Sequence, residues 1–207
     1  MINLLDPIVV ITRMFESGKF ADMLKYCTKL LEIDPSDMVA LQNSALALLH
    51  LEKFEESIIF CDRVLQIKNY DKYALKNKTF SLEKLKKYED ALNCCNIILK
   101  VDPSDIWALN SIGLSLNELN KHQEAIEFYD KTLKLDDKDI TALMNKAISL
   151  NHLKNYTESI EYYDKAQMVD PSLREASIAK SQSFEKLGLE DEAFLAAQGM
   201  LVKDMEK

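Results

Sequence analysis

The side chains that most often carry out chemistry are few in this chain of 207 residues, and their spacing forms no catalytic group. No histidine has a second histidine or cysteine at the spacing that would place two metal ligands on one helix. The four glycines stand apart from one another, so no glycine-rich phosphate-binding loop is present. The sequence therefore predicts no catalytic residue, no metal site, no cofactor and no enzymatic activity. The residues considered are Cys27, Cys61, Cys94, Cys95, His50, His122, His152, Gly18, Gly113, Gly188 and Gly199.

A second group of residues suits binding rather than catalysis. A side-chain amide both donates and accepts, so a row of asparagines can hold the N–H and C=O groups of an extended peptide whatever its side chains are. Tyrosine and tryptophan dominate binding hot spots because they bury a large area and keep a polar group. Two alternatives stay open: the asparagines are only tolerated polar residues beside a helix contact, and the tryptophan completes the core. The residues concerned are Asn43, Asn77, Asn145, Tyr73, Phe80 and Trp107.

The elements that position these residues are set by an internal repeat. The motif Asp-x-x-Ala-Leu begins at residues 37, 71, 105 and 139, a spacing that indicates one structural unit copied along the chain. Within a unit, apolar residues recur at three- and four-residue steps in two segments, as in Leu109, Ile112 and Leu116, which predicts two amphipathic helices. The expected domain is a single one over residues 1–207, with repeats 4–37, 38–71, 72–105, 106–139, 140–173 and 174–207.

Recurring residues within the repeat have separate physical roles. The repeated aspartate is expected to cap the first helix of each unit, because its carboxylate accepts from the free N–H groups at a helix start. Proline at positions such as Pro35 and Pro103 ends the preceding helix. Small residues such as Ala45, Gly113 and Ala147 share one place, where a neighbouring helix must approach closely. Cys27, Cys61 and Cys95 share another place and are expected to be buried and reduced.

The repeat resembles the tetratricopeptide repeat family over essentially the whole chain, with small, aromatic and proline residues at that family's positions. Gly113, Ala125 and Tyr129 match well, whereas cysteine replaces an aromatic residue in the first three units. The resemblance implies an all-α, right-handed superhelical solenoid of antiparallel helix pairs. It also implies that the first helix of each pair lines the concave side. The residues expected there, called the first-helix face below, are Asn43, Tyr73, Lys76, Asn77, Phe80, Trp107, Asn110, Leu114, Asn117, Met144, Asn145 and Ile148.

Composition restricts the class of partner. The formal net charge is −8, so the chain lacks the electrostatic attraction that dominates binding to nucleic acids or to anionic membranes. No stretch approaches the roughly 18 apolar residues of a membrane-spanning helix. The first ten residues contain Asp6 and Pro7 and lack a basic flank, which argues against a secretory signal and favours the cytoplasm.

Two functions remain. The leading one is a protein–protein interaction scaffold that binds a peptide segment of a partner protein in its concave groove. The alternative is a self-associating structural scaffold that uses apolar terminal repeats. Pro7 is expected inside the first helix, which makes the first repeat atypical. Residues 194–197 and 200–202 are expected to lack a covering helix. Exposed apolar ends of this kind favour contacts between copies of the chain.

Overall fold

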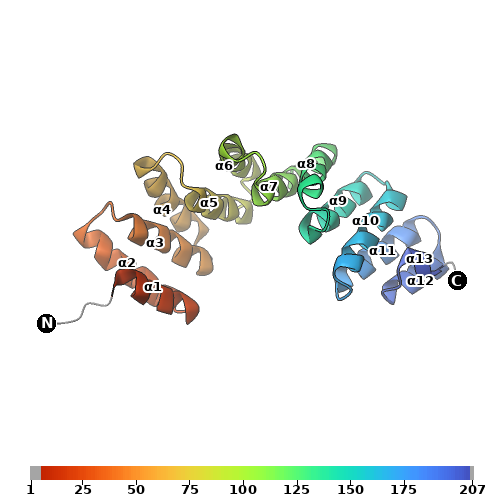
Figure 1. Cartoon of the computed structure of the whole chain (residues 1–207), viewed down its shortest axis with the longest axis horizontal. Helices are drawn as coiled ribbons and strands as arrows, with labels where there is room; N and C mark the ends of the chain where they lie inside the picture. The colour runs from red at the N-terminus through yellow and green to blue at the C-terminus, as the bar shows by residue number, and fades with distance from the viewer. Residues whose placement is uncertain (1–5, 206–207) are drawn as a thin grey trace. The chain divides into compact units, whose positions relative to one another are not determined.

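The computed structural model describes residues 6–205, which form helices, turns and bends and contain no strand (Figure 1). Residues 4–5 of the first predicted repeat, residues 206–207 of the last, and the first five residues of the apolar start lie outside this range. The helices are α1 (Pro7–Glu16), α2 (Phe20–Ile33), α3 (Met38–His50), α4 (Phe54–Ile67), α5 (Lys72–Lys84), α6 (Tyr88–Val101), α7 (Ile106–Glu118), α8 (His122–Leu135), α9 (Ile140–His152), α10 (Tyr156–Val169), α11 (Arg174–Lys186), α12 (Glu190–Ala197) and α13 (Val202–Met205).

The chain divides into two compact units, Met1–Val101 and Asp102–Lys207. In each unit consecutive helices pack against each other, from α1 to α6 and from α7 to α13. The first helices of neighbouring pairs also touch, α3 against α5 in one unit and α7 against α9 in the other. The predicted all-α solenoid of antiparallel helix pairs is therefore confirmed.

The 34-residue period is visible in the helix boundaries. Helices α3, α5, α7, α9 and α11 begin at residues 38, 72, 106, 140 and 174, and each has 13 residues. Four of their starts are capped as predicted, because the aspartate carboxylate accepts from the backbone N–H three residues later. In α11 the capping place is Leu173, and no side chain caps the helix. The capping aspartates are Asp37, Asp71, Asp105 and Asp139.

The turn between the two helices of a pair requires one residue in the left-handed region. Positive φ angles recur every 34 residues at this place, and the residue after each donates its N–H to a carbonyl five residues earlier, as from Lys53 to Leu48. Glycine fills the place at Gly18 and Gly188, so these two glycines, which stand alone in the sequence, do the same job in different repeats. The other four residues there are Glu52, Lys86, Asn120 and Lys154.

Close packing within a pair depends on the small residue of its first helix. Gly113 on α7 faces the ring of Tyr129 on α8, and a methyl group added to the glycine would overlap that ring. Tyr129 is fully buried. In α3 and α4 the equivalent residues are Ala45 and Cys61, both buried in one apolar cluster. All four cysteines are buried and free, as predicted.

A lysine–aspartate ion pair between neighbouring repeats was not foreseen from the sequence. Lys78, Lys146 and Lys180 each bind the aspartate that precedes them by sixteen residues. Lys180 is fully buried and lies 2.6 Å from Asp164. Burial works against the charge of Lys146, but hydrogen bonds from it to Asp130 and Tyr162 outweigh that effect and raise its pKa.

The last repeat departs from the pattern. Helix α12 ends at Ala197, and the chain turns at Gly199 and continues into the short helix α13. Val202 packs against a buried apolar cluster that includes Ala196. The prediction that residues 194–197 and 200–202 have nothing to cover them is therefore wrong for Ala196 and Val202, while Phe194 stays 66% exposed.

The start of the first helix also differs from expectation. Pro7 is the first residue of α1, rather than an interior one, and Asp6 caps the helix by accepting from the N–H of Ile8. A proline at this place removes no helical hydrogen bond, because its N–H would have no partner within the helix.

We predict that Gly113→Ala destabilises the protein. Moving the buried Tyr129 ring costs about 1–3 kcal/mol, and the better helix propensity of alanine returns only about 1 kcal/mol. In a Tyr129→Cys background, which copies the Ala45–Cys61 pair, the same substitution is expected to be neutral or stabilising. Urea unfolding followed by circular dichroism measures both effects. Equal losses in the two backgrounds would contradict the overlap between Gly113 and Tyr129.

Candidate functional site

The part of the first-helix face in the first unit lies on α3 and α5. Tyr73 is 76% exposed and Phe80 is 38% exposed, whereas Asn43, Lys76 and Asn77 are half-buried. The ammonium of Lys84 lies 5.1 Å from the centre of the Phe80 ring. Because α3 and α5 touch, Asn43 and the aromatic residues Tyr73 and Phe80 stand on neighbouring helices. This surface offers aromatic rings and amides beside the positive charges of Lys76 and Lys84.

The part in the second unit lies on α7 and α9, which also touch each other. Ile148 is 37% exposed, and the other members are half-buried. Next to Ile148 is a cavity of about 280 Å³ that extends the face to α11. The half-buried members are Trp107, Asn110, Leu114, Asn117, Met144 and Asn145. The cavity is lined by Ile148, Asn151, His152, Tyr156, Tyr163, Gln182, Ser183 and Lys186.

Three of the five predicted asparagine amides are used inside the protein. Asn43 donates to the carbonyl of Val39 in its own helix at 2.8 Å. Asn110 donates to Asp139 at 3.0 Å, just as Gln42 donates to Asp71 in the first unit.

The third, Asn117, joins a partly buried hydrogen-bond network. It accepts from the hydroxyl of Ser149 at 2.8 Å and donates to the hydroxyl of Tyr129 at 3.4 Å. Asn151 repeats the arrangement 34 residues later with Ser183 and Tyr163. These amides link neighbouring repeats.

Asn77 and Asn145 differ from the other three. Among residues 6–205, their side-chain amides make no hydrogen bond, and both side chains are half-buried. Both occupy the sixth place of a first helix, one in each unit, 68 residues apart. An unpaired amide held on a rigid helix can bond a ligand with little loss of conformational freedom.

Two of the three histidines lie side by side in the folded protein. The rings of His122 and His152 stack with centroids 4.4 Å apart, although the residues are 30 positions apart. The Nδ1 atom of His122 lies 3.1 Å from Oδ1 of Asn117. Because the two histidines start α8 and end α9, only the folded repeat brings them together.

No metal site accompanies this pair. Within the described residues no three His, Cys, Asp or Glu side chains gather closely enough to hold a metal ion.

We expect the histidine pair to make the second unit sensitive to mild acid. Burial, and then the charge of His152, lower the pKa of His122 below its ordinary value of 6.5. Below pH 6.5 the unfolded chain therefore binds more protons than the folded one, and the free energy of unfolding decreases as the pH is lowered. His152→Gln should reduce this loss, measured as Tm between neutral pH and about pH 5. The control is His50→Gln, which alters a histidine stacked on Phe20. Identical pH profiles for both variants would disprove the coupling.

Sequence comparisons identify repeats along most of the chain. Two models described as "Tetratricopeptide repeat" match residues 81–140 and 140–173. A model described as "Psidin, N-terminal TPR repeats region" matches residues 8–105. No protein of curated function matches the chain in a sequence search. No helix of residues 6–205 is long and apolar enough to cross a membrane.

Solved structures share the fold at low sequence identity. A tetratricopeptide repeat protein from Parabacteroides merdae is 20% identical with a TM-score of 0.80, over 92% of this chain and 75% of that one. MamA from Desulfovibrio magneticus, from residue 41 to its end, is 20% identical with a TM-score of 0.75, over 81% and 94%.

YrrB, described as a TPR protein with an unusual peptide-binding site, is 16% identical with a TM-score of 0.66, over 84% and 89%. The matched repeat models, the 34-residue period and the stacked helix pairs agree, and this chain belongs to the tetratricopeptide repeat family.

Proposed function

We propose that the protein is an interaction scaffold of the cytoplasm that holds a peptide segment of a partner protein against its first-helix face. The unpaired amides of Asn77 and Asn145 are the observation that carries this proposal. A half-buried amide with no partner among the described residues can bond the main chain of a bound peptide. Asn43, Asn110 and Asn117 have structural bonds, so they contribute shape more than hydrogen bonds.

Exposed aromatic and aliphatic side chains beside these amides support the same proposal. Tyr73 and Phe80 flank Asn77 on α5, and Ile148 follows Asn145 on α9. A peptide held by its main chain would bury its own apolar side chains against them, and such rings supply much of the free energy at binding hot spots. The peptide-binding site of YrrB, a protein of the same fold, is consistent with this kind of ligand.

We predict that Asn77→Ala or Asn145→Ala weakens binding of peptides selected from a displayed random library on the wild-type protein. Each lost amide contact is expected to raise Kd by about tenfold. Tyr73→Ala should cost about 2 kcal/mol of binding free energy if the ring is a hot spot. Asn96→Ala is the matched control, because Asn96 is exposed on α6. Peptides that bind all four variants like the wild type would rule out the first-helix face.

Self-association through the last repeat is the second candidate, supported by Phe194, a large aromatic side chain that is 66% exposed on α12. We expect Phe194→Ser to abolish any dimer that light scattering detects in the wild-type protein at high concentration. A wild-type protein that remains monomeric, or a dimer that survives the substitution, excludes this role for Phe194.

A further inference from the structure

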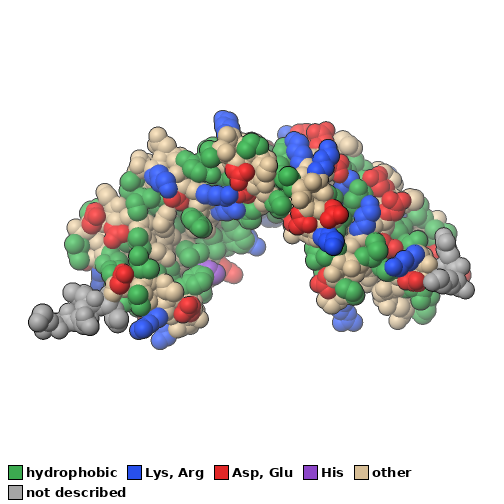
Figure 2. Space-filling model, viewed as in Figure 1, with side chains coloured by type: hydrophobic (Ala, Val, Ile, Leu, Met, Phe, Trp, Pro, Cys, Tyr) green, Lys and Arg blue, Asp and Glu red, His purple; other side chains and the backbone are tan. Residues whose placement is uncertain are grey.

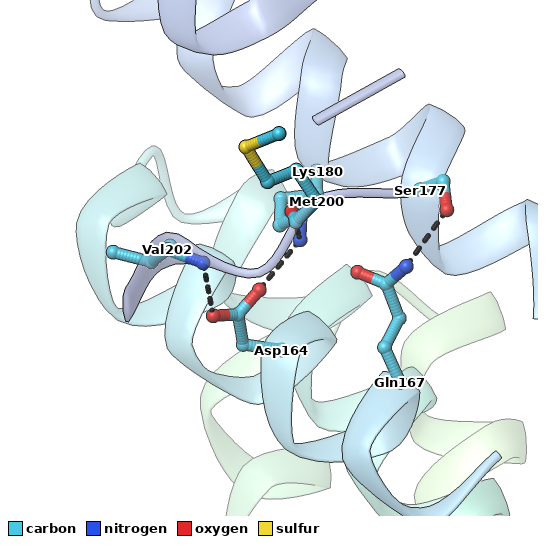
Figure 3. Close-up of polar contacts among 6 residues, drawn as sticks. All are labelled: Asp164, Gln167, Ser177, Lys180, Met200 and Val202. Carbon is cyan, nitrogen blue, oxygen red and sulfur yellow. Dashed lines mark hydrogen bonds and ion pairs between the residues drawn. The ribbon is translucent and has the colours of Figure 1, made fainter. Parts of the chain in front are cut away.

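The end of the chain shows how an ion pair between repeats can hold a polypeptide main chain. Between α12 and α13 the chain lies beside Asp164 and Lys180 (Figure 3). The ammonium of Lys180 donates to the carbonyl of Met200 at 2.7 Å, and the N–H of Val202 donates to Asp164 at 2.8 Å. Only Leu201 separates these two groups in the chain, so one ion pair binds the main chain on both sides of that residue.

The equivalent position one repeat earlier is a cavity. Asp130 and Lys146 form the same ion pair 34 residues before Asp164 and Lys180. Beside this pair lies a cavity of about 700 Å³ between α8 and α10. Here α10 continues as a helix to Val169, whereas the equivalent helix α12 stops at Ala197 and its chain folds inward. The cavity is lined by Asp130, Leu133, Lys134, Asp137, Lys138, Leu143, Tyr162, Lys165, Met168 and Val169.

The hydrogen-bonding groups of this cavity suit a peptide main chain. The side chain of Asp130 is 43% exposed, so its carboxylate can accept from a ligand N–H as Asp164 accepts from Val202. Lys146 donates to the hydroxyl oxygen of Tyr162 at 2.7 Å, which leaves the hydroxyl hydrogen available. Tyr162 can therefore donate to a ligand carbonyl.

The walls of the cavity favour an apolar side chain. Leu133 and Leu143 correspond to Gln167 and Ser177 at the end of the chain, where the two side chains hydrogen-bond to each other at 2.8 Å. The change replaces a polar pair with an apolar one. Met168, which is 53% exposed, adds further apolar surface.

Charge around the cavity favours an acidic ligand. The lining has three lysines, Lys134, Lys138 and Lys165, and two acidic residues, Asp130 and Asp137. Asp130 is already paired with Lys146. Basic and acidic side chains are interspersed with apolar ones on the visible side of the second unit (Figure 2). A carboxylate beside the apolar ligand residue would therefore be stabilised, and salt would weaken its attraction.

We propose that the cavity between α8 and α10 is a second peptide-binding site, separate from the first-helix face. Its ligand is a segment of a partner protein with an apolar residue followed by an acidic one. Asp130 accepts from the main-chain N–H of the apolar residue, and Tyr162 donates to a carbonyl two residues before it.

A labelled peptide with the sequence of residues 198–205 tests this site on the full chain by fluorescence polarisation. We expect saturable binding, and Asp130→Asn should raise Kd by about tenfold, because a charged acceptor is replaced by a neutral amide. A probe methylated on the main-chain nitrogen of the residue equivalent to Val202 should bind about tenfold more weakly, because it has no N–H to donate to Asp130. A probe with Lys203→Glu should bind more tightly at low salt, by attraction to the lysines.

Two control variants make the result specific. Asp62→Asn breaks the same ion pair in the first unit, where Cys94 stands in the place of Tyr162, and should leave the Kd of the probe unchanged. Asn145→Ala alters the first-helix face and should also have no effect. Because Asp130→Asn could disturb folding, Met168→Asp, at an exposed residue of the cavity wall, should weaken the probe independently.

Other outcomes would overturn the proposal. If Asp164→Asn but not Asp130→Asn weakens the probe, the probe has only displaced the end of its own chain. If the methylated probe binds as well as the unmodified one, main-chain recognition is wrong. If the wild-type protein forms dimers that vanish when residues 199–207 are removed, the occupant is a second copy rather than a partner protein.

Discussion

A helix pair of this protein cannot bury its own apolar stripe, and the rest of the structure depends on that constraint. Two antiparallel helices cover only one side of each other, so each pair must stack on the next to exclude water. The stack requires that a small residue on the first helix admit the second, as Gly113 admits Tyr129. It also requires that the turn between them have one fixed geometry, which six residues at 34-residue intervals adopt with positive φ. The spacing of the repeats, the geometry of the turns and the packing of the helices therefore all follow from the need to stack one helix pair on the next.

Most of this architecture could be predicted from the sequence because the repeated residues act locally. A capping aspartate such as Asp139 and a small residue such as Ala147 need only their own helix and the next one, so their spacing is informative. The left-handed turn was missed because only Gly18 and Gly188 reveal it, and they lie 170 positions apart. The extent of a single domain over residues 1–207 stays a prediction.

The candidate sites were less predictable, because asparagines of the same helix face either link neighbouring repeats or remain available to a ligand. In the sequence, Asn117 and Asn145 are both polar residues of the predicted first-helix face. In the structure, the amide of Asn117 links Ser149 to Tyr129, whereas the amide of Asn145 has no partner among the described residues. That difference depends on side-chain directions in three helices, which spacing does not contain. The stacking of His122 on His152 and the lysine–aspartate pairs depend on contacts between repeats in the same way. Whether the first-helix face binds peptides stays a prediction.

The buried cysteines have a consequence for the chemistry of the protein under oxidative stress. Burial raises the pKa of Cys27 to about 11 and that of Cys61 to about 12. Since the thiolate, and not the thiol, attacks peroxides, these side chains offer almost no reactive form near neutral pH. A cysteine in the place of the core aromatic ring therefore fills that position with a smaller side chain that does not react readily with oxidants.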